Sequence, residues 1–115
     1  MSAPRDDDDV IIETMVDAIT TIFAYIADQT LETFLANRMM KDAVAKNLEV
    51  VGESASQLSP GIKDRHAHIP WNDMIGLRHR LVHHYGGTDW AVVWETIRVD
   101  LTPLLEQLIP LQDQD

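Results

Sequence analysis

The sequence predicts an all-α protein, an up-and-down bundle of four long helices plus a short one. Apolar residues recur with the 3.6-residue period of helices, and no strand-like alternation is present. Only five glycines and five prolines interrupt the 115 residues, which disfavours a turn-rich β fold. This length and a hydrophobic content of 45% predict one domain over residues 1–115, with flexible segments at 1–8 and 110–115.

The first long helix is expected from about Asp9 to Ala27. Its apolar face would hold Ile12, Met15, Val16, Ile19, Ile22, Phe23 and Ile26. The aspartates at 6–9 suit the positive end of the helix dipole, and we prefer that interpretation to a metal site. Thr30 is placed to cap a short helix from Leu31 to Ala36.

The second long helix is expected from about Arg38 to Leu58. Its apolar face would hold Met40, Val44, Leu48, Val51, Ala55 and Leu58. Gly52 interrupts this pattern at a cost in helix propensity. Together with Ser54, Ala55 and Ser56 it forms a small-residue patch that would let a neighbouring backbone come close. Ser59-Pro60-Gly61 is expected to end the helix, and residues 61–70 to form a connector.

Asn72 is a good cap for a third long helix, from Asp73 to His83 or His84, which Gly86-Gly87 would end. A last helix is expected from Asp89 or Trp90 to Leu108. Its apolar face would hold Trp90, Val93, Ile97, Leu101, Leu104, Leu105 and Leu108. Pro103 falls inside that pattern and predicts a kink or a restart.

The composition excludes several classes of protein. No apolar run approaches the roughly 18 residues that a membrane-spanning helix needs, and the acidic start is the reverse of a signal peptide. The absence of cysteine excludes disulfides, thiolate zinc sites and cysteine nucleophiles. We therefore expect a cytoplasmic protein without a membrane partner, and we predict no metal and no cofactor.

The net charge of −10 is unevenly distributed. Segment 60–88 has four basic and two acidic residues, a charge of +2, so the remainder carries −12. The basic residues are Lys63, Arg65, Arg78 and Arg80, and all five histidines, His66, His68, His79, His83 and His84, lie in the same segment. The acidic total argues against a nonspecific nucleic-acid binder. The local basic segment is either chance clustering on the surface or an anion-binding region, with Arg80, His84, Lys63 and Arg65 as candidate RNA contacts.

Helical phase puts Arg78 on the apolar face of the third long helix, where a guanidinium needs a partner. It could form a structural ion pair with a carboxylate such as Glu53, reach water from the bundle edge, or have a functional role. Arg78 and His83 point about 140° apart on one ideal helix, so two antiparallel copies would be needed to place both around one cleft. Such a pair suits metal-independent RNA cleavage through the ribose 2′-hydroxyl, with histidine moving the proton and arginine stabilising phosphoryl charge.

His79 and His83 lie four residues apart on one helix face. This spacing could bind a metal, but a third ligand is needed and no HExxH-type glutamate is present. Exposed, solvated histidines are the favoured interpretation of the pair.

The spacing Arg78-x4-His83-x-Tyr85 matches the RX4HXY motif, and the sequence resembles the HEPN superfamily, specifically the HepT-like toxins of bacterial and archaeal toxin–antitoxin pairs. The resemblance runs from about Asp6 to Leu108. Its other matching segments, in order, are Val51-Gly52-Glu53-Ser54-Ala55, Ile69-Pro70-Trp71, Gly76-Leu77-Arg78, Leu81-Val82-His83-His84-Tyr85 and Asp100-Leu101 with Leu104.

The resemblance implies a HEPN-like bundle that forms a homodimer, with a composite ribonuclease site at the interface. Arg78 and His83 would be catalytic. His79 stands where the family often has a small polar residue, usually asparagine, and would support catalysis. Tyr85 would receive AMP from ATP through a minimal nucleotidyltransferase antitoxin. The alternative for Tyr85 is a core or interface aromatic whose hydroxyl reaches water.

Two other functions stay open. HEPN-like bundles also resemble the non-catalytic, substrate- or nucleotide-binding partners of small nucleotidyltransferases, and Arg78 and His83 would then bind a nucleotide or hold the dimer. The chain could instead be a plain interaction module in which Arg78 forms an interface ion pair.

Overall fold

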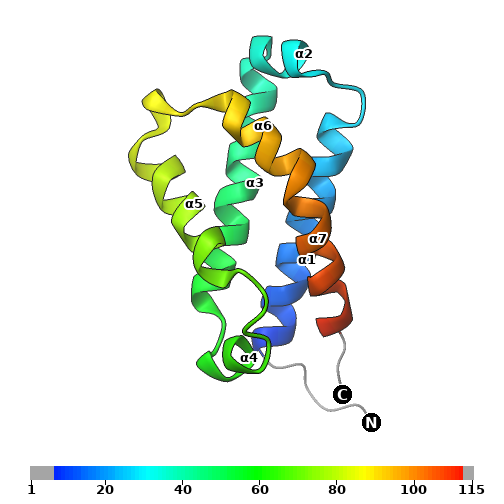
Figure 1. Ribbon diagram of the computed structural model, residues 1–115, viewed down its shortest axis with the longest axis vertical. Coiled ribbons are helices and arrows are strands. Elements are labelled where there is room, and N and C mark those ends of the chain that lie inside the picture. Colours follow the sequence, from blue (N-terminus) through cyan, green and yellow to red (C-terminus); the bar gives the residue numbers. More distant parts are fainter. Residues whose placement is uncertain (1–6, 113–115) are drawn as a thin grey trace.

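Helices form nearly all the regular structure of residues 7–112, the part of the chain that the computed structural model describes (Figure 1). The α-helices are α1 (Asp7–Ile26), α2 (Leu31–Ala36), α3 (Arg38–Gln57), α4 (Pro60–Arg65), α5 (Trp71–His83), α6 (Trp90–Val99) and α7 (Leu101–Leu108). Two 3₁₀ turns, η1 (Tyr85–Gly87) and η2 (Ile109–Leu111), follow α5 and α7. The predicted all-α bundle is confirmed. None of these helices is long and apolar enough to cross a membrane.

Helix α3 lies at the centre of the bundle. Helices α1 and α5 pack on it from two sides, and α6 and α7 form one bent arm in which α6 crosses in front of α3 and α7 lies over α1 (Figure 1). The arm packs on α1 through α7, whereas α5 packs chiefly on α3. Helix α5 therefore has one well-packed face and two flanks that border on open surface.

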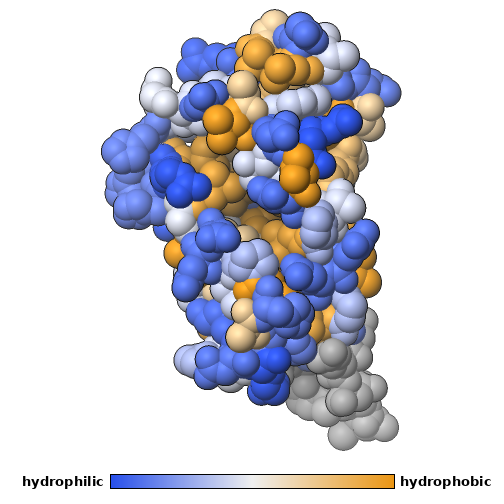
Figure 2. All heavy atoms as spheres, viewed as in Figure 1, coloured by the Kyte–Doolittle hydropathy of each residue, from blue (hydrophilic) through white to orange (hydrophobic). Residues whose placement is uncertain are grey.

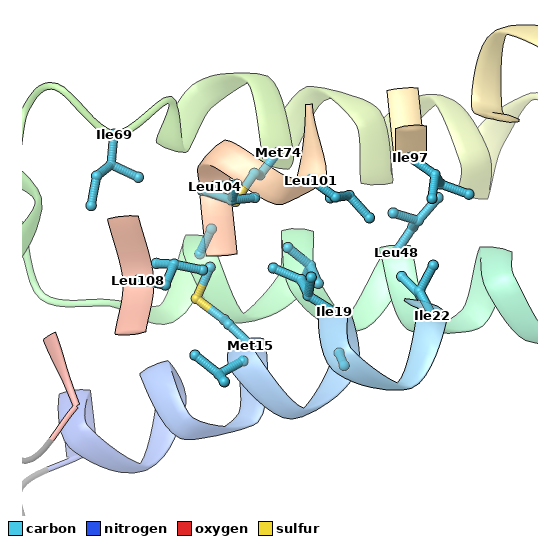
Figure 3. Packing of buried hydrophobic residues seen from close by; sticks show 14 of the residues in the cluster. Met15, Ile19, Ile22, Leu48, Ile69, Met74, Ile97, Leu101, Leu104 and Leu108 are labelled. Carbon is cyan, nitrogen blue, oxygen red and sulfur yellow. The ribbon is translucent and has the colours of Figure 1, made fainter. Parts of the chain in front are cut away.

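The core consists of the apolar faces that the sequence predicts. Met15, Ile19 and Ile22 of α1 lie close to Leu48 of α3 and to the arm (Figure 3). The arm contributes Ile97, Leu101, Leu104 and Leu108. Phe34 of the short α2 is fully buried and packs its ring against Trp94 of α6, with 5.2 Å between ring centroids. Thr30 caps α2 as predicted, because its hydroxyl accepts a hydrogen bond from the Thr33 amide.

Helices α3 and α5 touch most closely at Gly52. A Cβ atom added there would lie 2.3 Å from the Cβ of Arg78 and 2.7 Å from the carbonyl oxygen of Met74. No side chain fits into these distances, so only glycine allows the two backbones to come this close. The predicted role of the small-residue patch is thus confirmed at Gly52.

The segment between α3 and α5 differs from its prediction. Residues 61–70 were expected to be a connector, but Pro60–Arg65 form α4, since proline is favoured in the first turn of a helix, where its missing N–H has no partner to lose. Asn72 is not the cap that the sequence predicts, because α5 begins at Trp71 and Asn72 already lies inside the helix. The Trp71 indole donates a hydrogen bond to the carbonyl oxygen of His66 at 3.1 Å, which holds the turn before the helix.

Residues at both ends of the described part belong to regular structure. Asp8 lies in α1, and its two carboxylate oxygens accept hydrogen bonds from the backbone amide and the hydroxyl of Ser59, so it joins α1 to the start of α4. At the other end Leu111 is buried in η2. The flexibility expected for residues 1–8 and 110–115 stays a prediction, and residues 1–6 and 113–115 lie outside the described part.

Pro103 produces the predicted restart. Helix α6 ends at Val99 and α7 begins at Leu101, so the proline lies in the first turn of the new helix. A proline ring inside a continuous helix would clash with the carbonyl four residues earlier, which here belongs to Val99. The break therefore comes before the proline and bends the arm around the core.

We expect Gly52→Ala to lower the free energy of unfolding by about 1–3 kcal/mol, because the added methyl group overpacks the contact between α3 and α5. Gly76→Ala is the matched control, since its Cβ would meet only the end of the Arg80 side chain, at 3.6 Å. The control should gain up to about 1 kcal/mol from helix propensity. Chemical denaturation of both variants checks this, and equal stability of the two would contradict the packing argument.

Candidate functional site

Arg78 lies on the flank of α5 that borders α3. Its Nε atom is 3.0 Å from Oε2 of Glu53, so the ion pair that the sequence left as an alternative is present. The two side chains keep 37% and 46% of their surface exposed, and an ion pair this accessible to water contributes little to stability. Arg78 is therefore not a core residue, and its guanidinium remains accessible to an anionic ligand.

The surface around Arg78 is a shallow cleft of about 200 Å³ between α3 and α5. Glu53 and Val82 line it together with Lys46, Glu49, Val50 and Ser54. Val82 is 46% exposed and gives the cleft an apolar side. The cleft thus combines charged groups with apolar surface at the outer edge of the molecule.

His79 and His83 lie side by side on the outer face of α5. Their ring centroids are 4.3 Å apart, and both residues are exposed. Two neighbouring imidazoles can divide the work of proton transfer, because one can accept a proton while the other donates one. Among residues 7–112, no group of three His, Asp or Glu side chains is arranged to hold a metal ion.

Arg80 and His84 lie on the flank of α5 that faces α6. They border a groove of about 250 Å³ whose walls include Leu77 and Leu81 of α5 and Val92 and Val93 of α6. Figure 2 shows this side of the molecule as apolar surface bordered by hydrophilic side chains. This groove lies across α5 from the cleft that contains Arg78.

Lys63 and Arg65 do not join the other candidate residues within one chain. Both belong to the last turn of α4, next to the N-terminal end of α5 (Figure 1). His83 lies at the opposite, C-terminal end of α5. Thirteen residues of α-helix span about 20 Å. The proposed RNA contacts at these two positions are therefore remote from His83 in the same protomer.

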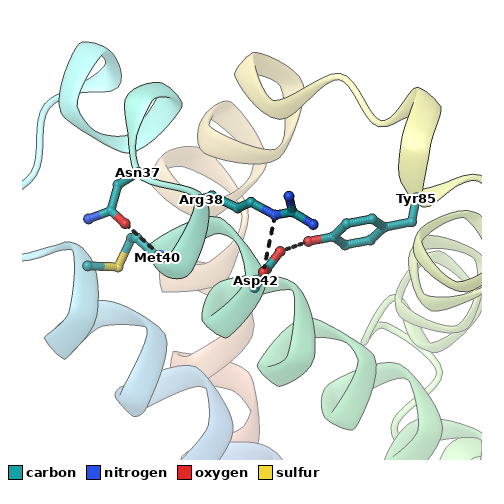
Figure 4. A network of polar contacts seen from close by, with 5 residues as sticks. All are labelled: Asn37, Arg38, Met40, Asp42 and Tyr85. Atoms are coloured by element: carbon teal, nitrogen blue, oxygen red, sulfur yellow. Dashed lines mark hydrogen bonds and ion pairs between the residues drawn. The ribbon is translucent and has the colours of Figure 1, made fainter.

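Tyr85 forms the most specific contact of the motif. Its hydroxyl donates a hydrogen bond to Oδ1 of Asp42 on α3, and Oδ2 of Asp42 lies 3.9 Å from Nε of Arg38 (Figure 4). The Tyr85 ring packs edge-on against Trp90, with 5.4 Å between centroids, and the residue is 37% exposed. The hydroxyl thus has a carboxylate partner on another helix.

Partial burial, the hydrogen bond to Asp42 and the charge of that carboxylate together raise the pKa of Tyr85 to about 12. Arg38 acts in the opposite sense. The phenol is therefore protonated at neutral pH. Sequence reasoning missed Asp42, because nothing in the pattern relates residues 43 positions apart on different helices.

The structure brings some motif residues together and separates others. His79 and His83 are neighbours, and Tyr85 is joined to α3, but Arg78 and His83 lie on different faces of α5. One protomer therefore does not direct Arg78 and His83 at a single phosphate.

Comparisons with known proteins agree on one family. The family described as "Ribonuclease HepT-like" matches residues 15–111. The "Probable ribonuclease HepT" of Thermococcus cleftensis is 32% identical over 93 residues, which cover 81% of this chain and 84% of that protein. "Putative RNase MJ0125" of Methanocaldococcus jannaschii is 29% identical over 104 residues, 90% of each chain.

A third relative is longer. "Gamma-glutamylcyclotransferase and putative RNase MJ0434" of the same archaeon is 26% identical over 110 residues, 96% of this chain. The match spans only 50% of that relative's length. No solved structure matches this chain with comparable significance.

We expect Tyr85 to ionise at about pH 12, two units above the ordinary value for tyrosine of about 10. Spectrophotometric titration of the wild type against Tyr85→Phe isolates its signal from that of Tyr25, the other tyrosine in the chain. Titration of both tyrosines near the ordinary value would show that the bond to Asp42 does not persist in solution.

Proposed function

This chain belongs to the family of HepT-like ribonucleases, and we propose that it is a metal-independent endoribonuclease toxin of a toxin–antitoxin pair. In this proposal RNA is cleaved at a composite site across a homodimer interface, with Arg78 and His83 as the catalytic residues. The observation that carries the proposal is the complete Arg78-x4-His83-x-Tyr85 motif, which runs from the second half of α5 into η1, within the matched residues 15–111.

The exposure and chemistry of the motif residues support this reaction. The His83 imidazole accepts the proton of a ribose 2′-hydroxyl, whose oxygen attacks the adjacent phosphorus. The bond from phosphorus to the 5′-oxygen breaks, and a protonated imidazole, for which His79 is the nearest candidate, returns a proton to that oxygen. The products are a 2′,3′-cyclic phosphate and a 5′-hydroxyl. Arg78 stabilises the negative charge that builds up on the phosphoryl oxygens, so the reaction needs no metal ion.

The separation of Arg78 from His83 on α5 supports a site built from two chains. If two α5 helices pack antiparallel across a two-fold axis, the arginine of one protomer can approach the histidine of the other. The same pairing brings the α4 end of one protomer, with Lys63 and Arg65, next to the His83 end of its partner. The candidate RNA contacts that are remote within one chain then lie near one cleft.

The charge distribution fits a restricted RNA substrate. Two copies of the +2 segment would make a basic cleft, with Arg80 and His84 beside it, on an otherwise acidic particle. The acidic remainder would repel long RNA and favour exposed single-stranded loops or ends.

The proposal includes neutralisation at Tyr85. A minimal nucleotidyltransferase antitoxin would transfer AMP from ATP to the Tyr85 hydroxyl. The phosphate and nucleoside added beside the cleft would block RNA by like-charge repulsion and by bulk. The accessibility of Tyr85, at 37%, is compatible with such a transfer.

The ion pair between Arg78 and Glu53 favours a second candidate function. An arginine already paired with a carboxylate could, with His83, bind a nucleotide or hold the dimer instead of cleaving RNA, and the chain would then be a non-catalytic substrate- or nucleotide-binding partner of a small nucleotidyltransferase. In that case purified protein would not cleave RNA at any concentration.

Arg78→Ala and His83→Ala should each lower the rate of RNA cleavage at least about 100-fold, because each removes a group that acts in the transition state. Arg98→Ala and His68→Ala are matched controls on other surfaces and should cleave at the wild-type rate. Gel-resolved cleavage of a labelled RNA measures this. Wild-type rates in both motif variants would refute the assignment of the catalytic pair.

Mixed dimers test whether the site is composite. A dimer of one Arg78→Ala chain and one His83→Ala chain keeps one intact arginine and one intact histidine on opposite protomers. If the site spans the interface, co-purified mixed dimers should regain about half of the wild-type activity, since one of two symmetric sites is complete. Dimers that stay inactive would mean that both residues must come from the same chain.

The proposed chemistry also predicts that excess EDTA leaves the cleavage rate unchanged, because Arg78 supplies the positive charge that a metal would otherwise provide. The cleavage assay with and without EDTA measures this. A loss of activity that added Mg²⁺ restores would contradict the metal-independent mechanism.

A further inference from the structure

The contact between Tyr85 and Asp42 joins an accessible hydroxyl to a carboxylate on another helix. Oδ1 of Asp42 accepts the hydrogen bond from the Tyr85 hydroxyl, and Asp42 itself is exposed at the surface of α3 (Figure 4). Arg38, the other partner of Asp42, keeps 89% of its side chain exposed and lies at the limit of an ion pair, so its hold on Asp42 is weak. The carboxylate is therefore available for proton transfer.

The surroundings of the hydroxyl favour one direction of approach. Trp90 packs against the Tyr85 ring from the side of α6, and α3 lies beyond Asp42. Lys41 places its ammonium group 5.6 Å from the centre of the Trp90 ring. Of the charged groups that act on the hydroxyl, Asp42 and Glu49 are negative and Arg38, in the first turn of α3, is positive.

A neutral phenol is a weak nucleophile, and the Tyr85 hydroxyl stays protonated at neutral pH. Transfer of a nucleotidyl group to it therefore requires a base that removes the proton as the new bond forms. Asp42 is already hydrogen-bonded to that proton in the unmodified protein. No other residue needs to move into place for the proton transfer.

We propose that Asp42 is the general base for transfer of a nucleotidyl group from a nucleoside triphosphate to Tyr85. The phenol oxygen attacks the α-phosphorus, and the bond from this phosphorus to the oxygen that bridges it to the β-phosphate breaks. Pyrophosphate leaves with the electron pair, and the phenol proton passes to Oδ1 of Asp42 and then to water. This inference rests on the proposed function, because it concerns the regulation of the same site. In this proposal the chain that is modified also provides the general base for the reaction.

The experiment measures incorporation of label from α-labelled ATP into this chain by a purified minimal nucleotidyltransferase. Asp42→Asn keeps an oxygen that can accept the Tyr85 hydrogen bond but removes the base, and it should lower the initial rate at least about 100-fold. Glu49→Gln is the matched control. Glu49 lies on the same helix and adds negative charge near Tyr85, yet the hydroxyl donates to Asp42, so this variant should be labelled at the wild-type rate.

The possible outcomes separate this inference from the proposed function. If the wild type takes up no label, or if Tyr85→Phe is labelled like the wild type, the proposed modification fails. If the wild type is labelled at Tyr85 and Asp42→Asn is labelled equally fast, only the role of Asp42 is overturned. An equal loss in Asp42→Asn and Glu49→Gln also overturns it, because general electrostatics would then suffice.

A readout without the partner enzyme tests the geometry directly. The Tyr85 phenol should titrate lower in Asp42→Asn than in the wild type, toward the ordinary value of about 10, because the neutral amide no longer favours the protonated phenol. Identical titrations in the two proteins would overturn the inference whatever the labelling shows. Circular dichroism of each variant confirms that the comparison is between folded proteins.

Discussion

The close contact between α3 and α5 at Gly52 determines where the functional residues lie. Without a side chain at this position the two helix backbones approach each other, and the Cβ atom of Arg78 lies against the glycine. Arg78 is thereby fixed at the edge of the contact, where its guanidinium reaches both Glu53 and solvent. A larger residue at position 52 would separate the helices and move the whole outer face of α5.

The end of α5 is positioned by different forces. The helix ends at His83, and the turn that follows has few apolar contacts with the bundle, since Gly86 and Gly87 carry no side chains. Tyr85 joins this turn to the bundle through its hydrogen bond to Asp42 of α3 and its ring contact with Trp90 of α6. The residue that holds this turn to α3 is thus also the residue whose hydroxyl is proposed to be modified. The proposed modification and the local structure would therefore depend on the same atom.

Helix α5 separates its polar residues onto different faces. Arg78 borders the cleft beside α3, Arg80 and His84 border the groove beside α6, and His79 and His83 face outward. A helix with this distribution offers no single site within one protomer. It does offer three adjacent surfaces that a second copy could complete, which is why the proposed ribonuclease site requires a dimer and why the mixed-dimer experiment is decisive for it.

The sequence by itself determined the long helices and the short α2 but not α4, together with the apolar faces, the close approach at Gly52 and the break before Pro103, because each depends on local periodicity or on the shape of one residue. It also identified the motif that the family shares. Only the tertiary structure showed that Arg78 pairs with Glu53, that Tyr85 pairs with Asp42, that Asp8 holds Ser59, and that Lys63 and Arg65 lie far from His83. These contacts join residues on different helices, and the packing angles that bring such residues together do not follow from periodicity along one chain segment.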